Sequence, residues 1–276
     1  MSQPAPLSQN LEELEQIVRD AGALALGYFG MPVRAWEKNP NDPVSEADLA
    51  VNDLLHERLQ IDHETGWLSE ESRDDPERLS KAATWVVDPI DGTRAFLRGD
   101  PSFAVSVALV QNGRPVLGAV YRPASDEMYL AQTGCGASLN GKSLKVSKRK
   151  SLEGCKIFAE KELMHDARHW PLQWPQMRYL SLPALALRLS SIGAGRAEAM
   201  ISLRPKCDWD LAAADLILHE AGGICLDETG APLNYNQPSA RQSAIIATTP
   251  HLLNAIRQRI DPALAGIKAA GLTKGH

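Results

Sequence analysis

Two aspartates three residues apart, Asp88 and Asp91, are the side chains in this sequence best placed to do chemistry. They follow the β-branched run Trp85-Val86-Val87, enclose Pro89-Ile90, and are followed directly by Gly92. Because proline cannot donate to a sheet ladder, strand pairing must break here, and the chain turns with both carboxylates close together. Like charges at that separation need a counter-cation, or one of them must take up a proton. Mg²⁺ prefers oxygen ligands and shares them with phosphate, so the motif predicts metal-assisted phosphate chemistry.

Further acids stand in similar contexts. Glu70 and Glu71 follow the apolar step Trp67-Leu68-Ser69. Neighbouring strand residues point to opposite faces, so one glutamate can enter a site while the other faces outward; an exposed acidic turn is the alternative. Asp210 lies at the start of an expected helix, where it can cap the helix, project into a shared cavity, or do both. The same two interpretations apply to Asp48, in the first turn of another expected helix.

Composition narrows the class of protein. The chain has 276 residues, 44% of them hydrophobic and 23% charged, which is ordinary for one large globular domain or two coupled ones. A net charge of −5 argues against a general binder of nucleic-acid polymers. No apolar run approaches the roughly 20 residues of a membrane span, and the N-terminus lacks the order of a signal peptide. Four cysteines without metal-like spacing predict buried free thiols in a reducing cytoplasm.

Hydrophobic periodicity predicts the elements that position these acids. Asn10 with Glu13 resembles a capping pair for the first helix. Residues 38–43 form a polar, turn-rich segment that we expect to be a mobile loop. Helices are expected over residues 11–28, 45–59, 183–191, 209–221 and 250–260, and strands over 85–87, 103–110, 116–121, 127–131, 142–146, 198–202, 224–226 and 244–247.

The spacing of the expected strands also predicts topology. Asn112-Gly113 and Asn140-Gly141 are typical hairpin turns, so the first half should hold antiparallel strands. After residue 150 helical and extended patterns alternate, with a join expected near residues 147–155. We therefore expect two halves. Residues 1–150 would carry most of the acids, and residues 151–276 would carry Asp210 and the region that sets substrate specificity.

Taken together, these motifs resemble the inositol monophosphatase superfamily, the lithium-sensitive, Mg²⁺-dependent phosphatases of sugars and nucleotides. The likeness covers nearly the whole chain, in the right order. It implies a layered αβαβα sandwich of the α+β or α/β class, with an antiparallel sheet in the first half and a mixed sheet in the second, and a cytoplasmic homodimer. The matching residues are Asp42-Pro43-Val44-Ser45-Glu46-Ala47-Asp48, Ser69-Glu70-Glu71-Ser72, Asp88-Pro89-Ile90-Asp91-Gly92-Thr93, and Trp209-Asp210 leading to Glu220-Ala221-Gly222-Gly223.

The resemblance implies two to three Mg²⁺ ions. One would be held by Glu70, Asp88 and the backbone carbonyl of Ile90. A second would be held by Asp88, Asp91 and Asp210. A third, weaker ion would be bound to Glu70 through water.

The resemblance also implies roles in catalysis. Glu70 and Thr93 would orient the attacking water, and Asp48 would polarise the Thr93 hydroxyl. The amides of Gly92 and Thr93 would cradle the phosphate, with Asp91 also beside the substrate. Clustered cations would activate the water and stabilise the leaving alkoxide, so no covalent phosphoenzyme is needed.

The substrate is less constrained by sequence. Inositol monophosphatases usually carry an acid several residues before the Trp-Asp motif, whereas residues 200–207 contain none and Asp208 comes too late. Arg204 and Lys206 stand there instead and can bind a second phosphate; the alternative is a pair of ordinary surface cations. Arg94-Ala95-Phe96 resembles the CysQ-type bisphosphate nucleotidases, which remove the 3′-phosphate from 3′-phosphoadenosine 5′-phosphate. Pro183-Ala184 departs from the Gly-Ser that the family usually has near the non-phosphate end of the substrate.

We therefore expect a Mg²⁺-dependent phosphomonoesterase that acts on a small phosphorylated substrate, with no nucleic-acid polymer or membrane as partner. A bisphosphate nucleotidase is the first expectation. An inositol monophosphatase-like enzyme, or a histidinol-phosphate or sugar-phosphate phosphatase, is the alternative. A non-catalytic interaction protein on the same fold is the alternative of another class, and the intact acidic set argues against it.

Overall fold

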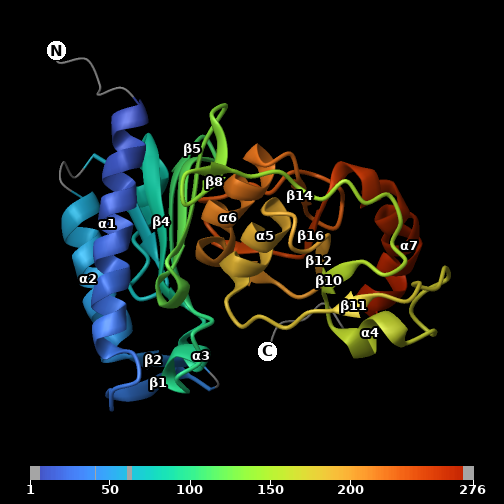
Figure 1. Ribbon diagram of the computed structural model, residues 1–276, viewed down its shortest axis with the longest axis horizontal. Coiled ribbons are helices and arrows are strands. Elements are labelled where there is room, and N and C mark those ends of the chain that lie inside the picture. The colour runs from blue at the N-terminus through green and yellow to red at the C-terminus, as the bar shows by residue number, and fades with distance from the viewer. Residues whose placement is uncertain (1–6, 41, 61–63, 270–276) are drawn as a thin grey trace.

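The computed structural model describes residues 7–40, 42–60 and 64–269. Its helices and sheets form successive layers: a helical pair, a large sheet, a second helical pair, a smaller sheet and a long final helix (Figure 1). This order confirms the expected αβαβα sandwich. The helices of the three helical layers are α1 (Leu7–Tyr28) and α2 (Glu46–Leu59), α5 (Leu185–Gly193) and α6 (Asp208–Glu220), and α7 (Pro250–Ala269).

The large sheet has seven strands in the order β3-β4-β5-β6-β7-β8-β9. Its neighbours are antiparallel except β3, which runs parallel to β4. Both predicted hairpin turns are present, since Asn112-Gly113 and Asn140-Gly141 all have positive φ angles. The strands are β3 (Gly66–Ser69), β4 (Ala83–Asp91), β5 (Ala104–Gln111), β6 (Arg114–Arg122), β7 (Glu127–Gln132), β8 (Gly136–Leu139) and β9 (Lys142–Ser143).

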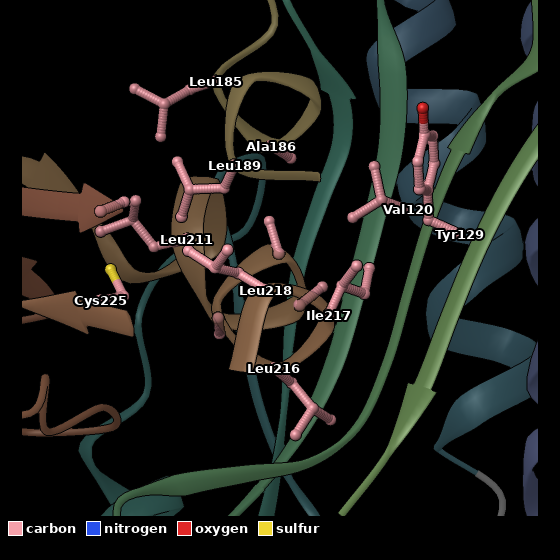
Figure 2. Close-up of a cluster of buried hydrophobic side chains, with 14 of the residues drawn as sticks. Val120, Tyr129, Leu185, Ala186, Leu189, Leu211, Leu216, Ile217, Leu218 and Cys225 are labelled. Atoms are coloured by element: carbon pink, nitrogen blue, oxygen red, sulfur yellow. The ribbon is translucent and has the colours of Figure 1, made fainter. Parts of the chain in front are cut away.

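Both faces of the large sheet are covered, which explains its nearly continuous apolar strands. Along β5, Val105 and Val107 belong to the core shared with α1 and α2, whereas Ala104 and Ala108 belong to the core shared with α5 and α6. Figure 2 shows this second core, where side chains of α5 and α6 lie between Val120 of the large sheet and Cys225 of the smaller one. The alternation fixes which face each strand residue presents.

The smaller sheet is mixed, as expected, in the order β11-β10-β12-β16-β14. Strand β10 runs parallel to β11 and β12, and β16 runs antiparallel to β12 and β14. The large sheet ends at Ser143 and the smaller one begins at Lys156, on either side of the expected join; the division into two halves stays a prediction. The strands are β10 (Lys156–Phe158), β11 (Arg178–Tyr179), β12 (Ala199–Ser202), β14 (Ile224–Leu226) and β16 (Ile245–Thr248).

Several expectations about local structure were wrong. Within the segment 38–43 that was expected to be a loop, the described residues 38–40, 42 and 43 belong to a hairpin, in which β1 (Ala35–Asn39) pairs with β2 (Asp42–Ser45), and Asn41 lies outside the described residues. Helix α1 begins at Leu7, before the expected cap at Asn10, and α7 continues through Pro262 to Ala269. The strand expected over residues 142–146 ends after two residues, because the chain leaves β9 to reach the smaller sheet. The shorter elements are α3 (Thr93–Leu97), α4 (Lys161–His165), β13 (Lys206–Cys207) and β15 (Arg241–Gln242).

The four cysteines are free, as predicted, but they are not uniformly buried. Cys155 and Cys225 are buried, whereas Cys207 is half-buried and Cys135 is exposed. Among the described helices, none has the length and apolarity that crossing a membrane requires.

Candidate active site

An irregularity in strand β4 brings the two aspartates of the central motif together. Asp88 lies opposite Ser106 of β5, and Asp91 lies opposite Ala104, so three steps along β4 match two steps along β5. In a regular strand, residues three apart point to opposite faces. The extra residue at Pro89-Ile90 is a β-bulge, which allows both carboxylates to point to one side. The predicted break in pairing at the proline is confirmed.

Helix α6 delivers the third acid to the same place. Its first turn is tied to the large sheet, because Ser106 Oγ donates to the carbonyl oxygen of Trp209 at 3.3 Å. Asp210 Oδ2 accepts from the backbone N–H of Cys207 at 3.1 Å, so it caps the helix. Its carboxylate also joins those of Asp88 and Asp91, with one oxygen from each within 4.8 Å of the others. Asp210 therefore both caps α6 and belongs to the acidic cluster.

Glu70 reaches this cluster from the edge of the sheet. Strand β3 runs parallel to β4 with Ser69 beside Val87, and the Glu70 N–H donates to the Val87 carbonyl at 3.2 Å. Glu70 is thereby placed next to Asp88. All four acids line one open cavity of about 480 Å³, together with Thr93 and Gly92. The structure brings together every predicted metal-ligating side chain, which are Glu70, Asp88, Asp91 and Asp210.

The carboxyl groups that converge in the cavity create a site that a cation would stabilise. Burial, with the neighbouring acids, raises the pKa of Glu70, Asp91 and Asp210 to about 7 each. The pKa of Asp88 is raised well above its ordinary value, first by burial and then by its four acidic neighbours, Glu70, Asp91, Asp210 and Asp48. Asp88 Oδ1 is one of the few buried side-chain atoms in the described chain that lack a hydrogen-bond partner. A partnerless carboxylate oxygen among converging acids fits a hard divalent cation such as Mg²⁺.

A lysine from the β1–β2 hairpin lies against the same acids, which the sequence did not predict. Lys38 Nζ is 3.3 Å from Glu70 Oε1 and 2.9 Å from Glu71 Oε1. The expectation that Glu71 faces outward was wrong, because its side chain is 2% exposed. Burial raises the Glu71 pKa to about 7 even against this pairing. Although burial opposes its charge, the two glutamates raise the pKa of Lys38.

The N-terminus of α5 holds Asp91 in place. Asp91 Oδ1 accepts from the Leu185 N–H at 2.9 Å, and Oδ2 accepts from the Ala186 N–H at 2.7 Å. Gly92, which follows, has a φ of +94°, and a Cβ there would lie 3.2 Å from the Ser102 carbonyl oxygen. Glycine is therefore required at this turn for both its conformation and its size.

Thr93 and Asp48 meet as the resemblance implied. Thr93 Oγ1 lies 3.0 Å from Asp48 Oδ1 and 3.1 Å from the carbonyl oxygen of Ile90, and its single proton serves these two acceptors. The other oxygen of Asp48 accepts from the Ser45 N–H at 2.8 Å and from Ser45 Oγ at 2.5 Å. Both Thr93 and Asp48 are buried. Asp48 is thus fixed as an acceptor for the Thr93 hydroxyl. That the Ile90 carbonyl also binds a metal stays a prediction.

The two cations predicted for the substrate differ in position. Lys206 is half-buried and lines a second cavity of about 210 Å³. Arg204 lies further out, with 44% of its side chain exposed and its Nε 3.1 Å from Glu160 Oε1. A third cation was missed: Arg188 of α5 lines both the first cavity and the second. An arginine in the mostly apolar run Leu185–Gly193 is the signal that points to it.

The chain is similar in sequence to named proteins of one family. The model of the inositol monophosphatase family matches residues 7–261. An inositol-1-monophosphatase of Rhizobium meliloti is 34% identical over 91% of this chain and 95% of its own length. A histidinol-phosphatase of Chlorobaculum parvum is 32% identical over 81% and 88%, and the Nus factor SuhB of Pasteurella multocida is 30% identical over 83% and 86%. These relatives support the family and leave the particular likeness to bisphosphate nucleotidases as a proposal.

Solved structures share the fold of this chain. The IMPase of Thermotoga maritima superposes with a TM-score of 0.79 at 26% identity, over 94% of this chain and 99% of its own. The extragenic suppressor protein SuhB of Bartonella henselae superposes with a TM-score of 0.77 at 29% identity, over 91% and 97%. With the converging acids, the Thr93–Asp48 contact and these matches, the chain belongs to the inositol monophosphatase family, whose members are Mg²⁺-dependent phosphatases.

Proposed function

We propose that this phosphatase hydrolyses a phosphate monoester that carries a second phosphate, with 3′-phosphoadenosine 5′-phosphate as the substrate. The observation that carries the proposal is the junction of two cavities. The first contains Glu70, Asp88, Asp91 and Asp210, and the second, which shares lining residues with it, contains Lys206. The reactive phosphate belongs at the acids with two Mg²⁺ ions, and the rest of the substrate extends toward the cationic side.

The chemistry follows from the donors and acceptors present. Bound at the four carboxylates, Mg²⁺ supplies charge for the phosphoryl oxygens and lowers the pKa of the attacking water. Thr93 donates its single proton toward Asp48 or the Ile90 carbonyl, so its lone pairs are left to accept a hydrogen bond from that water. Glu70, which lines the same cavity, orients the same water. The amides of Gly92 and Thr93 hold a phosphate oxygen where the chain turns into α3.

Charge discriminates between the candidate substrates. Beyond the reactive phosphate, a bisphosphate nucleotide is anionic, inositol 1-phosphate is neutral and histidinol phosphate is cationic. The second cavity contains Lys206 and Arg188, and its acid, Glu160, is paired with Arg204. A cationic leaving group would be repelled there, and a neutral one would leave the cations without a partner. The surroundings therefore favour the anionic substrate.

The test compares phosphate release from 3′-phosphoadenosine 5′-phosphate, inositol 1-phosphate and histidinol phosphate, with Mg²⁺ and with added Li⁺. We expect a kcat/KM for the nucleotide at least about tenfold above either alternative, which corresponds to about 1.4 kcal/mol. Preference for inositol phosphate or histidinol phosphate would disprove the proposed substrate and leave the proposed metal chemistry intact.

The homodimer implied by the resemblance stays a prediction, which light scattering would test.

A further inference from the structure

Arg188 lies where the two cavities of the active site meet. The larger cavity holds the acidic cluster, and the smaller one holds Lys206. Arg188 and Ser181 line both. A substrate whose reactive phosphate lies at the acids must therefore pass Arg188 to enter the smaller cavity. Arg188 is half-buried, and its charge faces Asp91 and Asp210 on the acidic side.

The guanidinium of Arg188 is held in a fixed orientation. Its Nε donates to the Leu182 carbonyl oxygen at 2.5 Å, and Nη2 donates to that of Pro183 at 3.3 Å. An arginine has five N–H donors in one plane. In the described structure two of them donate to these carbonyl oxygens, and the other three remain for a ligand in the cavities that Arg188 lines. A pre-oriented planar group with several donors is suited to bidentate binding of phosphate.

The charges around Arg188 select an anion as its ligand. Lys206 brings a second cation into the smaller cavity. Burial lowers the pKa of both Lys206 and Arg188, so each has lost much of its hydration and gains from an anionic partner. The acid that lines the smaller cavity, Glu160, is already paired with Arg204 at 3.1 Å. Once Mg²⁺ occupies the carboxylates, Arg188 and Lys206 are the cations left to bind substrate there.

We propose that Arg188, together with Lys206, binds the second phosphate of the substrate and sets the preference for bisphosphates over monophosphates. This assignment rests on the proposed function for the site of the reactive phosphate. It keeps Lys206 from the pair that the sequence suggested and replaces Arg204, which lies between β12 and β13, by Arg188 of α5. Arg204 then serves to neutralise Glu160, so that this acid does not repel the second phosphate.

The experiment measures kcat/KM for 3′-phosphoadenosine 5′-phosphate and for adenosine 3′-monophosphate, which lacks the second phosphate. In Arg188→Met the value for the bisphosphate should fall about 100-fold, while the monophosphate changes less than about threefold. Arg188→Lys keeps the charge, and its kcat/KM for the bisphosphate should be about a tenth of the wild-type value. The double variant Arg204→Met/Glu160→Gln removes a cation without leaving an unpaired acid, and its preference should equal that of the wild type. Equal Mg²⁺ binding in all variants, measured by calorimetry, shows that the metal site is intact.

Other results would overturn the assignment. An equal fall for both substrates in Arg188→Met would mean that Arg188 supports Asp91 or the fold. An unchanged preference would mean that the second phosphate binds elsewhere, for instance at Arg98, an exposed residue that lines the larger cavity. A further outcome is that the wild type hydrolyses sugar bisphosphates faster than the matched monophosphates and does not hydrolyse the nucleotide. That result would disprove the nucleotide as substrate and leave the role of Arg188 in binding the second phosphate intact. If none of these substrates is hydrolysed, the affinity for the bisphosphate is measured by calorimetry in the presence of Ca²⁺. Equal affinities of the wild type and Arg188→Met would disprove the role of Arg188 in binding the second phosphate.

Discussion

The ammonium nitrogen of Lys38 lies 2.9 and 3.0 Å from the two carboxylate oxygens of Glu71, and 3.3 Å from Glu70 Oε1. This contact ties the β1–β2 hairpin to the acidic end of β3. One ammonium is shared by both glutamates, so it compensates each only in part, and burial raises the pKa of each to about 7. Lys38 thus acts as the chain's own counter-cation beside the predicted metal site.

Replacing this lysine should destabilise the metal-free protein more than the Mg²⁺-bound protein. Lys38→Met leaves Glu71 buried without its cation, and we expect the free energy of unfolding to drop by about 2 kcal/mol. This is below the cost of a fully buried pair, because the lysine side chain is 24% exposed. Thermal unfolding with and without Mg²⁺ measures the difference. Lys148→Met, at an exposed position, is the control, and an equal loss in both metal states would contradict the interpretation.

Asp88 and Asp91 should respond differently to the same substitution. Both Asp88→Asn and Asp91→Asn should lower kcat at least about 100-fold by removing a metal ligand. In the metal-free protein at about pH 8, Asp88→Asn should raise the melting temperature, since it removes a carboxyl whose ionised form burial and the neighbouring acids disfavour and whose Oδ1 has no partner in the described chain. Asp91→Asn should lower it, because an amide N–H₂ would face the N–H of Leu185 or Ala186. Equal shifts for the two variants would show that their surroundings are equivalent.

The sequence predicted the acids of the site because each is part of a local signal. Asp88 and Asp91 stand at a strand end with proline and glycine, and Asp210 stands where a helix begins. That these segments converge could not be derived from spacing alone. The convergence depends on the bulge in β4, which turns Asp88 and Asp91 to one side, and on the Ser106–Trp209 hydrogen bond, which joins β5 to a helix 103 residues further along the chain.

The missed residues lack such local signals. Lys38 lies in a polar stretch whose composition favours a loop. The hairpin forms because β1 and β2 pair with each other as antiparallel strands. Glu71 was expected to face water because successive strand residues alternate, but β3 ends at Ser69 and the alternation ends with it. Arg188 belongs to a mostly apolar helix, and only the packing of α5 against its neighbours decides that its side chain lines the cavities.

Thr93 should matter for the chemical step and little for metal binding. Thr93→Ala removes the hydroxyl that Asp48 holds at 3.0 Å, and we expect kcat to fall about 100- to 1,000-fold. Thr93→Ser keeps the hydroxyl and should retain most of the activity. Calorimetry should give unchanged Mg²⁺ affinity for both variants. A loss of Mg²⁺ binding in Thr93→Ala would instead assign the residue to the metal site.

The metal-free protein should become less stable as pH rises. Burial raises the pKa of Glu70, Asp91 and Asp210 to about 7 in the folded protein, whereas carboxyls in an unfolded chain titrate near pH ~4. Between these values the folded state binds more protons than the unfolded state, so the free energy of unfolding falls with increasing pH. The contribution of these acids is full below about pH 4 and is lost as pH rises through about 7.

Mg²⁺ should reverse this dependence, because it takes the place of the protons on the same carboxylates. We expect the rise in melting temperature on adding Mg²⁺ to be several degrees larger at about pH 8 than at about pH 5.5. Thermal unfolding at both pH values, with Mg²⁺ or with chelator, measures it. Asp210→Asn removes one of the titrating acids and should shrink the difference between the two pH values. A Mg²⁺-induced rise that is the same at both pH values would mean that these acids are not protonated in the metal-free site.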